Sequence, residues 1–122
     1  MKRVLSVGQC SMDHGSISRF LKSNFDVEVI PVATVADATD KMRQKGIDLV
    51  LVNRQFDHDG TEGVDFIRDI KADKDLAALP IMLITNFPEY AQEAVALGAE
   101  PGFGKAELSS KDLASRLKPF LS

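Results

Sequence analysis

The feature that most constrains the fold is a regular alternation of short apolar runs with segments of helical apolar spacing. The apolar runs lie at 4–7, 27–32, 47–52 and 80–85, with a weaker one at 102–104. The third run has no polar residue after Asp48, which is typical of a parallel strand covered on both faces. Five strand–helix units of this kind predict an α/β fold, a doubly wound parallel sheet with helices on both faces.

The predicted helices carry one apolar stripe each, the pattern of helices that pack on a sheet. The stripes are Ile17, Phe20 and Leu21; Val35, Ala38 and Met42; Val64, Ile67 and Ile70; and Leu113, Leu117, Phe120 and Leu121. Thr34 followed by Asp37 resembles a capping box, and Ser109 or Ser110 is suited to cap the last helix. Pro88 and Gly98 are suited to the first turn and the end of the fourth helix.

The length and composition indicate one soluble domain spanning 1–122. The chain has 122 residues, of which 44% are hydrophobic and 27% charged, and its formal net charge is −3. We expect no nucleic acid partner, because no basic stripe is present, and no membrane association, because no apolar run approaches ~20 residues. A single cysteine, Cys10, and an N-terminus without a long apolar run favour the cytoplasm.

Ligand sites in doubly wound folds lie at the carboxyl ends of the strands. The residues that follow the apolar runs are therefore the candidates, namely those at 8–10, 53–60, 85–87 and Lys105. The segment 8–12 is not a glycine loop that would cradle a phosphate. A flavodoxin-like ligand-binding domain consequently stays an alternative that only the fold class supports.

Several of these stretches together resemble one family over nearly the whole chain. They are 48–53 followed by Asp59-Gly60, the run 81–85 ending in Thr85, and Gly98-Ala99 followed by Lys105. In order and spacing they resemble the receiver domain of two-component response regulators. The resemblance implies a five-stranded sheet of order 2-1-3-4-5, five helices and a role in signal transduction.

The resemblance also implies a chemistry, which this chain has lost at its centre. In the family a carboxylate after the third strand accepts phosphate, and two acidic residues after the first strand help to hold Mg²⁺. The acceptor position is Asn53 here, and the acidic pair maps onto Gly8 and Gln9. A carboxamide is uncharged and a poor nucleophile. The matching threonine and lysine, Thr85 and Lys105, are retained.

We therefore predict an atypical pseudo-receiver that is not an enzyme and uses no metal or cofactor. Gly102 stands where the family has its switch aromatic, and Ala106 stands where a proline is usual. One hypothesis is that Lys105 donates a hydrogen bond to the side-chain oxygen of Asn53; the alternative is that its ammonium group points to solvent.

The loop carboxylates Asp57 and Asp59 define the alternative function, a phosphoacceptor that uses a relocated carboxylate. Their other interpretation is solvation of a turn before the third helix. We interpret His14 and His58 as ordinary polar residues, because no paired ligand stands at metal spacing.

The function expected from these residues is protein–protein interaction without phosphorylation. The resemblance places a homodimer or partner interface on the fourth helix, the fifth strand and the fifth helix. The candidate surface residues are Glu89, Tyr90, Glu93, Lys111, Asp112 and Arg116, whose mixed charges permit ion pairs between helices. Phe103 is expected to pack under the fifth helix.

Overall fold

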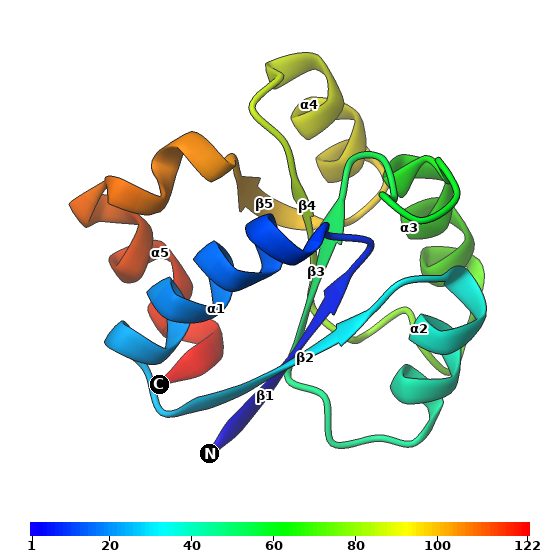
Figure 1. Ribbon diagram of the computed structural model, residues 1–122. Helices are drawn as coiled ribbons and strands as arrows, with labels where there is room; N and C mark the ends of the chain where they lie inside the picture. Colours follow the sequence, from blue (N-terminus) through cyan, green and yellow to red (C-terminus); the bar gives the residue numbers. More distant parts are fainter.

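The computed structural model describes all residues, 1–122, and its strands and helices alternate along the chain (Figure 1). The strands are β1 (Lys2–Val7), β2 (Val27–Val32), β3 (Leu49–Asn53), β4 (Ile81–Ile84) and β5 (Glu100–Phe103). The helices are α1 (Ser11–Asn24), α2 (Val35–Arg43), α3 (Gly63–Ala72), α4 (Pro88–Ala96) and α5 (Lys111–Leu121), with a 3-10 helix, η1 (Lys105–Ser109), before α5. The five predicted strand–helix units are confirmed.

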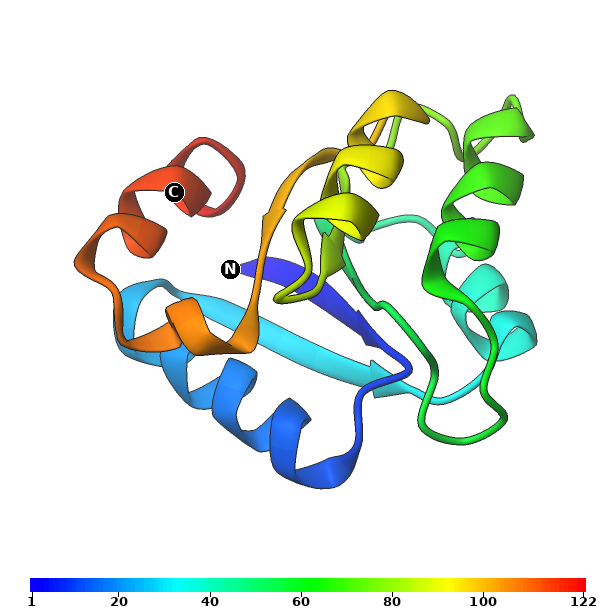
Figure 2. The same cartoon turned by 90° about the horizontal axis from the view of Figure 1, so that it is seen from above.

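The strands form one parallel sheet in the order β2-β1-β3-β4-β5, as predicted. Helices α1 and α5 cover one face, and α2, α3 and α4 cover the other (Figure 2). Two hydrophobic cores result. On β3, Leu49 and Leu51 point to the α1 and α5 side, whereas Val50 and Val52 point to the other. This double burial explains why the run is apolar throughout.

The predicted helix ends are largely as expected. The Thr34 hydroxyl accepts a hydrogen bond from the backbone N–H of Asp37 at 3.2 Å, and the Ser110 hydroxyl accepts one from Asp112 at 3.3 Å. Pro88 opens α4, and Gly98 follows it with a φ of +109°. None of the helices combines the length and the apolar character that crossing a membrane would take.

Two details differ from the sequence prediction. Val35, expected in the stripe of α2, is 37% exposed, because it stands at the first position of the helix, before the turn that packs on the sheet. β5 begins at Glu100 rather than at Gly102, and its pairing with β4 is irregular. A Cβ at Gly102 would collide with the carbonyl of Leu83, so only glycine allows this close approach.

Candidate functional site

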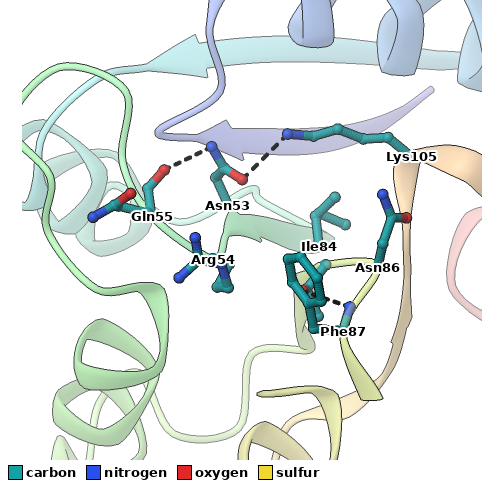
Figure 3. Close-up of a pocket in the computed structure, with 8 residues that line it drawn as sticks. Asn53, Arg54, Gln55, Ile84, Asn86, Phe87 and Lys105 are labelled. Atoms are coloured by element: carbon teal, nitrogen blue, oxygen red, sulfur yellow. Dashed lines mark hydrogen bonds between the residues drawn. The ribbon is translucent and has the colours of Figure 1, made fainter. Parts of the chain in front are cut away.

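A cavity of about 270 Å³ lies at the carboxyl ends of β3 and β4 (Figure 3). Its lining residues are Asn53, Arg54, Gln55, Ile84, Thr85, Asn86, Phe87 and Lys105. The structure thus brings together three of the residues singled out from the sequence, Asn53, Thr85 and Lys105. Gly8 reaches the site through a hydrogen bond with Asn53, whereas Gln9, Asp57 and Asp59 do not line the cavity.

The carboxamide of Asn53 is fully engaged with protein groups. Its nitrogen donates to the backbone carbonyl of Gln55 at 2.8 Å and to that of Gly8 at 3.1 Å. Its oxygen accepts a hydrogen bond from the Lys105 ammonium group at 3.3 Å. Of the two alternatives for Lys105, the structure therefore has the contact with the Asn53 oxygen and not an ammonium group that points to solvent. Because both N–H groups of the amide are used, the side chain has a defined orientation at the end of β3.

Lys105 has a second partner that the sequence analysis missed. Its ammonium group donates to a carboxylate oxygen of Asp13 at 2.7 Å. This hydrogen bond holds the pKa of Asp13 below its usual value of 3.8, against the opposing effect of burial. Asp13 lies in the first turn of α1, where its backbone N–H also donates to the Cys10 sulfur at 3.5 Å. The helix begins right after β1, so its first turn reaches the same end of the sheet.

Phe56 fills the space beside Gly8. Gly8 has a φ of +76°, and a Cβ built on it would lie 2.6 Å from atoms of the Phe56 ring. That ring is 1% exposed and packs edge-on against Phe66 with centroids 5.8 Å apart. The Gly8 carbonyl also accepts a hydrogen bond from the backbone of Asp57 at 2.9 Å. Position 8, which the resemblance matched to an acidic residue, therefore admits only a residue without a side chain.

The segment that carries Lys105 is tied to its neighbours. The backbone N–H of Gly104 donates to the Glu107 carboxylate at 2.8 Å, and that of Ala106 donates to the Asn86 side-chain oxygen at 3.2 Å. Arg116 of α5 contacts Glu107 and donates to the carbonyl of Gly102 at 3.1 Å. These bonds connect the end of β5 to the end of β4 and to α5.

Arg54 and two aromatic residues form the outer part of the pocket. The Arg54 guanidinium carbon lies 4.8 Å from the ring centroid of Tyr90 and 5.9 Å from that of Phe87, distances typical of cation–π contacts. Phe87 is 52% exposed and meets Tyr90 edge-on at 6.2 Å. The sequence analysis singled out neither Arg54 nor Phe87 by its chemistry, because their contact with Tyr90 joins distant segments.

Thr85 serves the start of α4 as well as the pocket. Its hydroxyl oxygen accepts a hydrogen bond from the backbone N–H of Phe87 at 3.1 Å. This bond fixes the turn between β4 and α4, a common role for threonine before a helix. The hydroxyl hydrogen is not used by that bond.

Of the two loop carboxylates, Asp59 bonds to its own loop. Asp59 accepts hydrogen bonds from the Thr61 hydroxyl at 2.7 Å and from the Thr61 backbone at 3.0 Å. These bonds, the hydroxyl first, lower the pKa of Asp59. Gln55 and Glu62 close the loop through an antiparallel bridge. Asp57 and Asp59 are both exposed.

The residues present do not fit the Mg²⁺ ion that the family's chemistry implies. Mg²⁺ requires oxygen ligands, usually including one or two carboxylates. Here the Asn53 N–H groups point at the carbonyls of Gly8 and Gln55, and Asp13 is occupied by Lys105. No group of three or more His, Cys, Asp or Glu side chains converges anywhere in the structure.

Comparison with solved structures places the fold among receivers. The signal receiver domain of a DNA-binding response regulator (merR) from Colwellia psychrerythraea 34H superposes with a TM-score of 0.81 at 21% identity, over 98% of this chain and 97% of that one. The chemotaxis protein CheY4 of Vibrio cholerae gives 0.77 at 23% identity, over 99% of both chains. A response regulator from Thermotoga maritima gives 0.77 at 20% identity, over 98% and 97%.

The fold is that of a receiver domain. No protein-family model and no curated protein matches the sequence. The likeness is therefore one of fold, and within that fold the site has its own arrangement.

The sequence analysis allowed for ion pairs between the helices of the expected interface on α4, β5 and α5. The ion pairs in the structure instead join these helices to neighbouring elements. Glu93 of α4 pairs with Arg68 of α3 at 3.7 Å, and Arg116 of α5 pairs with Glu107 of η1. Neither pair links α4 to α5. As predicted, Phe103 is buried with the α5 residues Leu113 and Leu117.

Proposed function

We propose that this chain is a receiver-type signalling domain that acts by binding a protein partner and does not accept phosphate. The observation that carries the proposal is the hydrogen bonding of Asn53. Its carboxamide donates to the carbonyls of Gly8 and Gln55 and accepts from Lys105. These bonds match an amide in both directions, and a carboxylate in the same pose would face two carbonyl oxygens with no hydrogen between them.

The surroundings of Lys105 support a single signalling state. In the family, the matching lysine binds the phosphate and takes part in the conformational change. Here Asp13 and Asn53 both bind its ammonium group, so protein oxygens take the place of phosphate oxygens. The bonds from Gly104 to Glu107 and from Ala106 to Asn86 hold the backbone around it. We infer that this domain presents one fixed surface to its partner.

An exposed apolar surface on α4 and β5 supports the interaction role. It is a shallow hollow of about 440 Å³, lined by Ala91, Gln92, Val95, Ala96, Pro101 and Gly102. Val95, one of these lining residues, is 44% exposed. Charged residues of α4 and α5, Glu89, Lys111 and Asp112 among them, are also exposed. An apolar centre with a polar rim is the common anatomy of a protein interface.

The phosphate half of the proposal is tested by incubating the protein with acetyl phosphate and Mg²⁺ and measuring its intact mass. We expect no added phosphoryl group. An adduct that disappears in Asp57→Asn or Asp59→Asn would instead establish the relocated phosphoacceptor, and an adduct of any kind would overturn the proposal. A colourless purified protein argues against the flavodoxin-like alternative with a bound flavin.

The interaction half is tested by sedimentation over a wide concentration range and by affinity capture of partners. We expect either self-association or capture of a specific partner, weakened in Val95→Glu. Val35→Glu is the matched control, since Val35 is a similarly exposed valine (37%) on α2, away from this surface. A protein that stays monomeric and captures nothing, or a Val95→Glu variant that behaves like the control, would contradict the proposal.

A further inference from the structure

We propose that the pocket binds an oxyanion, a phosphate or carboxylate group, reversibly and without a metal, with Arg54 as its main contact. The inference goes beyond the proposed function, which needs no ligand in this pocket. Two cationic side chains, Arg54 and Lys105, line the cavity, and no carboxylate does. The ammonium group of Lys105 is paired with Asp13 at 2.7 Å, whereas the Arg54 guanidinium pairs with Glu62 only at 3.9 Å, so Arg54 is the less committed of the two cations.

Arg54 is held in place while its hydrogen-bond donors stay free. The guanidinium carbon lies over the Tyr90 ring, 4.8 Å from its centroid, a contact that restricts the side chain without using any N–H group. The carboxylate that pairs with it, Glu62, lies 3.9 Å away, beyond hydrogen-bond distance. A guanidinium group with a free edge is suited to bind two oxygens of a phosphate or carboxylate at once.

Two further side chains of the pocket have donors to spare. The Asn86 oxygen accepts the N–H of Ala106, which leaves both hydrogens of its amide nitrogen without a protein partner. The Thr85 oxygen accepts the N–H of Phe87, which leaves its hydroxyl hydrogen to donate. Figure 3 shows Arg54, Asn86 and Lys105 arranged around the same space, with the Phe87 ring on its edge. An oxyanion there would meet donors from several side chains.

The test is an NMR titration of ¹⁵N-labelled protein with potassium phosphate and, separately, potassium acetate, at constant ionic strength and without divalent cations. We expect saturable shifts of the Arg54 side-chain N–H and of the backbone N–H groups of Asn86 and Phe87. Arg54→Ala should weaken the binding by about tenfold. Arg68→Ala is the control, because Arg68 is an exposed arginine of α3 that does not line the pocket.

The two titrations distinguish the source of the oxyanion. Tighter binding of phosphate would indicate a free or ligand-borne phosphate group, and tighter binding of acetate would indicate an acidic side chain. Arg54→Lys keeps the charge but loses the planar fork, and should bind at least threefold more weakly than wild type. Shifts that do not saturate, or equal affinities in wild type, Arg54→Ala and Arg54→Lys, would overturn the inference. Because binding is reversible and leaves the intact mass unchanged, this result is independent of the phosphorylation test.

Discussion

The two sides of the pocket contrast sharply. On the closed side, Gly8, Asn53 and Phe56 fill the space with protein groups, and the hydrogen bonds of the Asn53 amide are satisfied. On the open side, the Arg54 guanidinium group has no acceptor within hydrogen-bond distance, and Phe87 is 52% exposed. The closed side holds the positions that the resemblance matched to the family's acceptor and metal ligands. The open side holds Arg54, which follows Asn53, and Phe87, which follows Thr85 and Asn86.

This difference shows that the closed side is packed and hydrogen-bonded in its own way. Removing three carboxylates alone would leave a polar hollow. Instead an aromatic ring packs against a glycine in the left-handed conformation, and an amide bridges two carbonyls. Side chains added at position 8, or a carboxylate at position 53, should therefore destabilise the closed side.

The largest effect is expected for Gly8→Ala. The backbone at this position has a φ of +76°, which alanine disfavours, and the added Cβ would press on the Phe56 ring, so we expect a loss of about 2–4 kcal/mol in the free energy of unfolding. Urea denaturation measures it. In the control Gly15→Ala, the new Cβ meets only Arg19 at 3.6 Å in a helix, and stability should rise by about 0.5–1 kcal/mol. Equal effects at both positions would refute the closed packing.

Asn53→Asp should cost about 1–3 kcal/mol at neutral pH. The new carboxylate oxygen would face the carbonyls of Gly8 and Gln55 at the distances where the amide now donates. The free energy of unfolding from urea titration measures the loss. Asn24→Asp is the control, because the Asn24 amide donates to a single carbonyl at an exposed position. A variant at position 53 as stable as the wild type would show that the amide is not required.

Lys105→Ala should lower the free energy of unfolding by about 1–2 kcal/mol. The change removes the bonds to Asp13 and Asn53 and leaves a half-exposed carboxylate without its cation. Thermal unfolding is the measurement, with Lys74→Ala as a control at an exposed lysine that forms no ion pair. An unchanged melting temperature in Lys105→Ala would mean that the ammonium group is held no better than in solvent.

The smallest effect is expected for Asp13→Asn, about 0.5–1 kcal/mol at pH 7. The pKa of Asp13 is lower in the folded chain than its usual 3.8, so its contribution to stability is complete above pH 3.8. It is lost as the pH falls through the folded-state pKa. The stability difference between wild type and Asp13→Asn should therefore shrink on acidification below pH 3.8. A stability difference that stays constant across that range would show that the ionised Asp13 carboxylate does not stabilise the fold through Lys105.

The fold was predictable because the sequence signals for strands and helices depend on residues that are close together in the chain. Strand runs, helical stripes and capping residues such as Thr34 and Ser110 act over a few positions, and the observed elements follow them. The bond from Lys105 to Asn53 was predictable too, since parallel strands end at one edge of the sheet. β5 was placed poorly because its proline and glycines lack the usual strand pattern.

The remaining features depend on contacts that no local pattern encodes. Phe56 is an apolar residue in a loop, and its partner Gly8 lies 48 positions earlier in the sequence. Arg54 meets Tyr90 only because β3 and β4 are adjacent and α4 follows β4 directly. Asp13 was not predicted because it does not follow β1 directly; it lies in the first turn of α1, which brings its carboxylate to Lys105.

The central claim is that the metal side of this pocket is closed and its anion side is open. The most direct measurement is one ¹⁵N NMR experiment in which MgCl₂ and then potassium phosphate are added to the same sample. We expect Mg²⁺ to leave the amide signals of Gly8, Asn53 and Gln55 in place, and phosphate to shift those of Asn86 and Phe87. Saturable shifts of Gly8 and Gln55 with Mg²⁺, together with no response to phosphate, would contradict the claim.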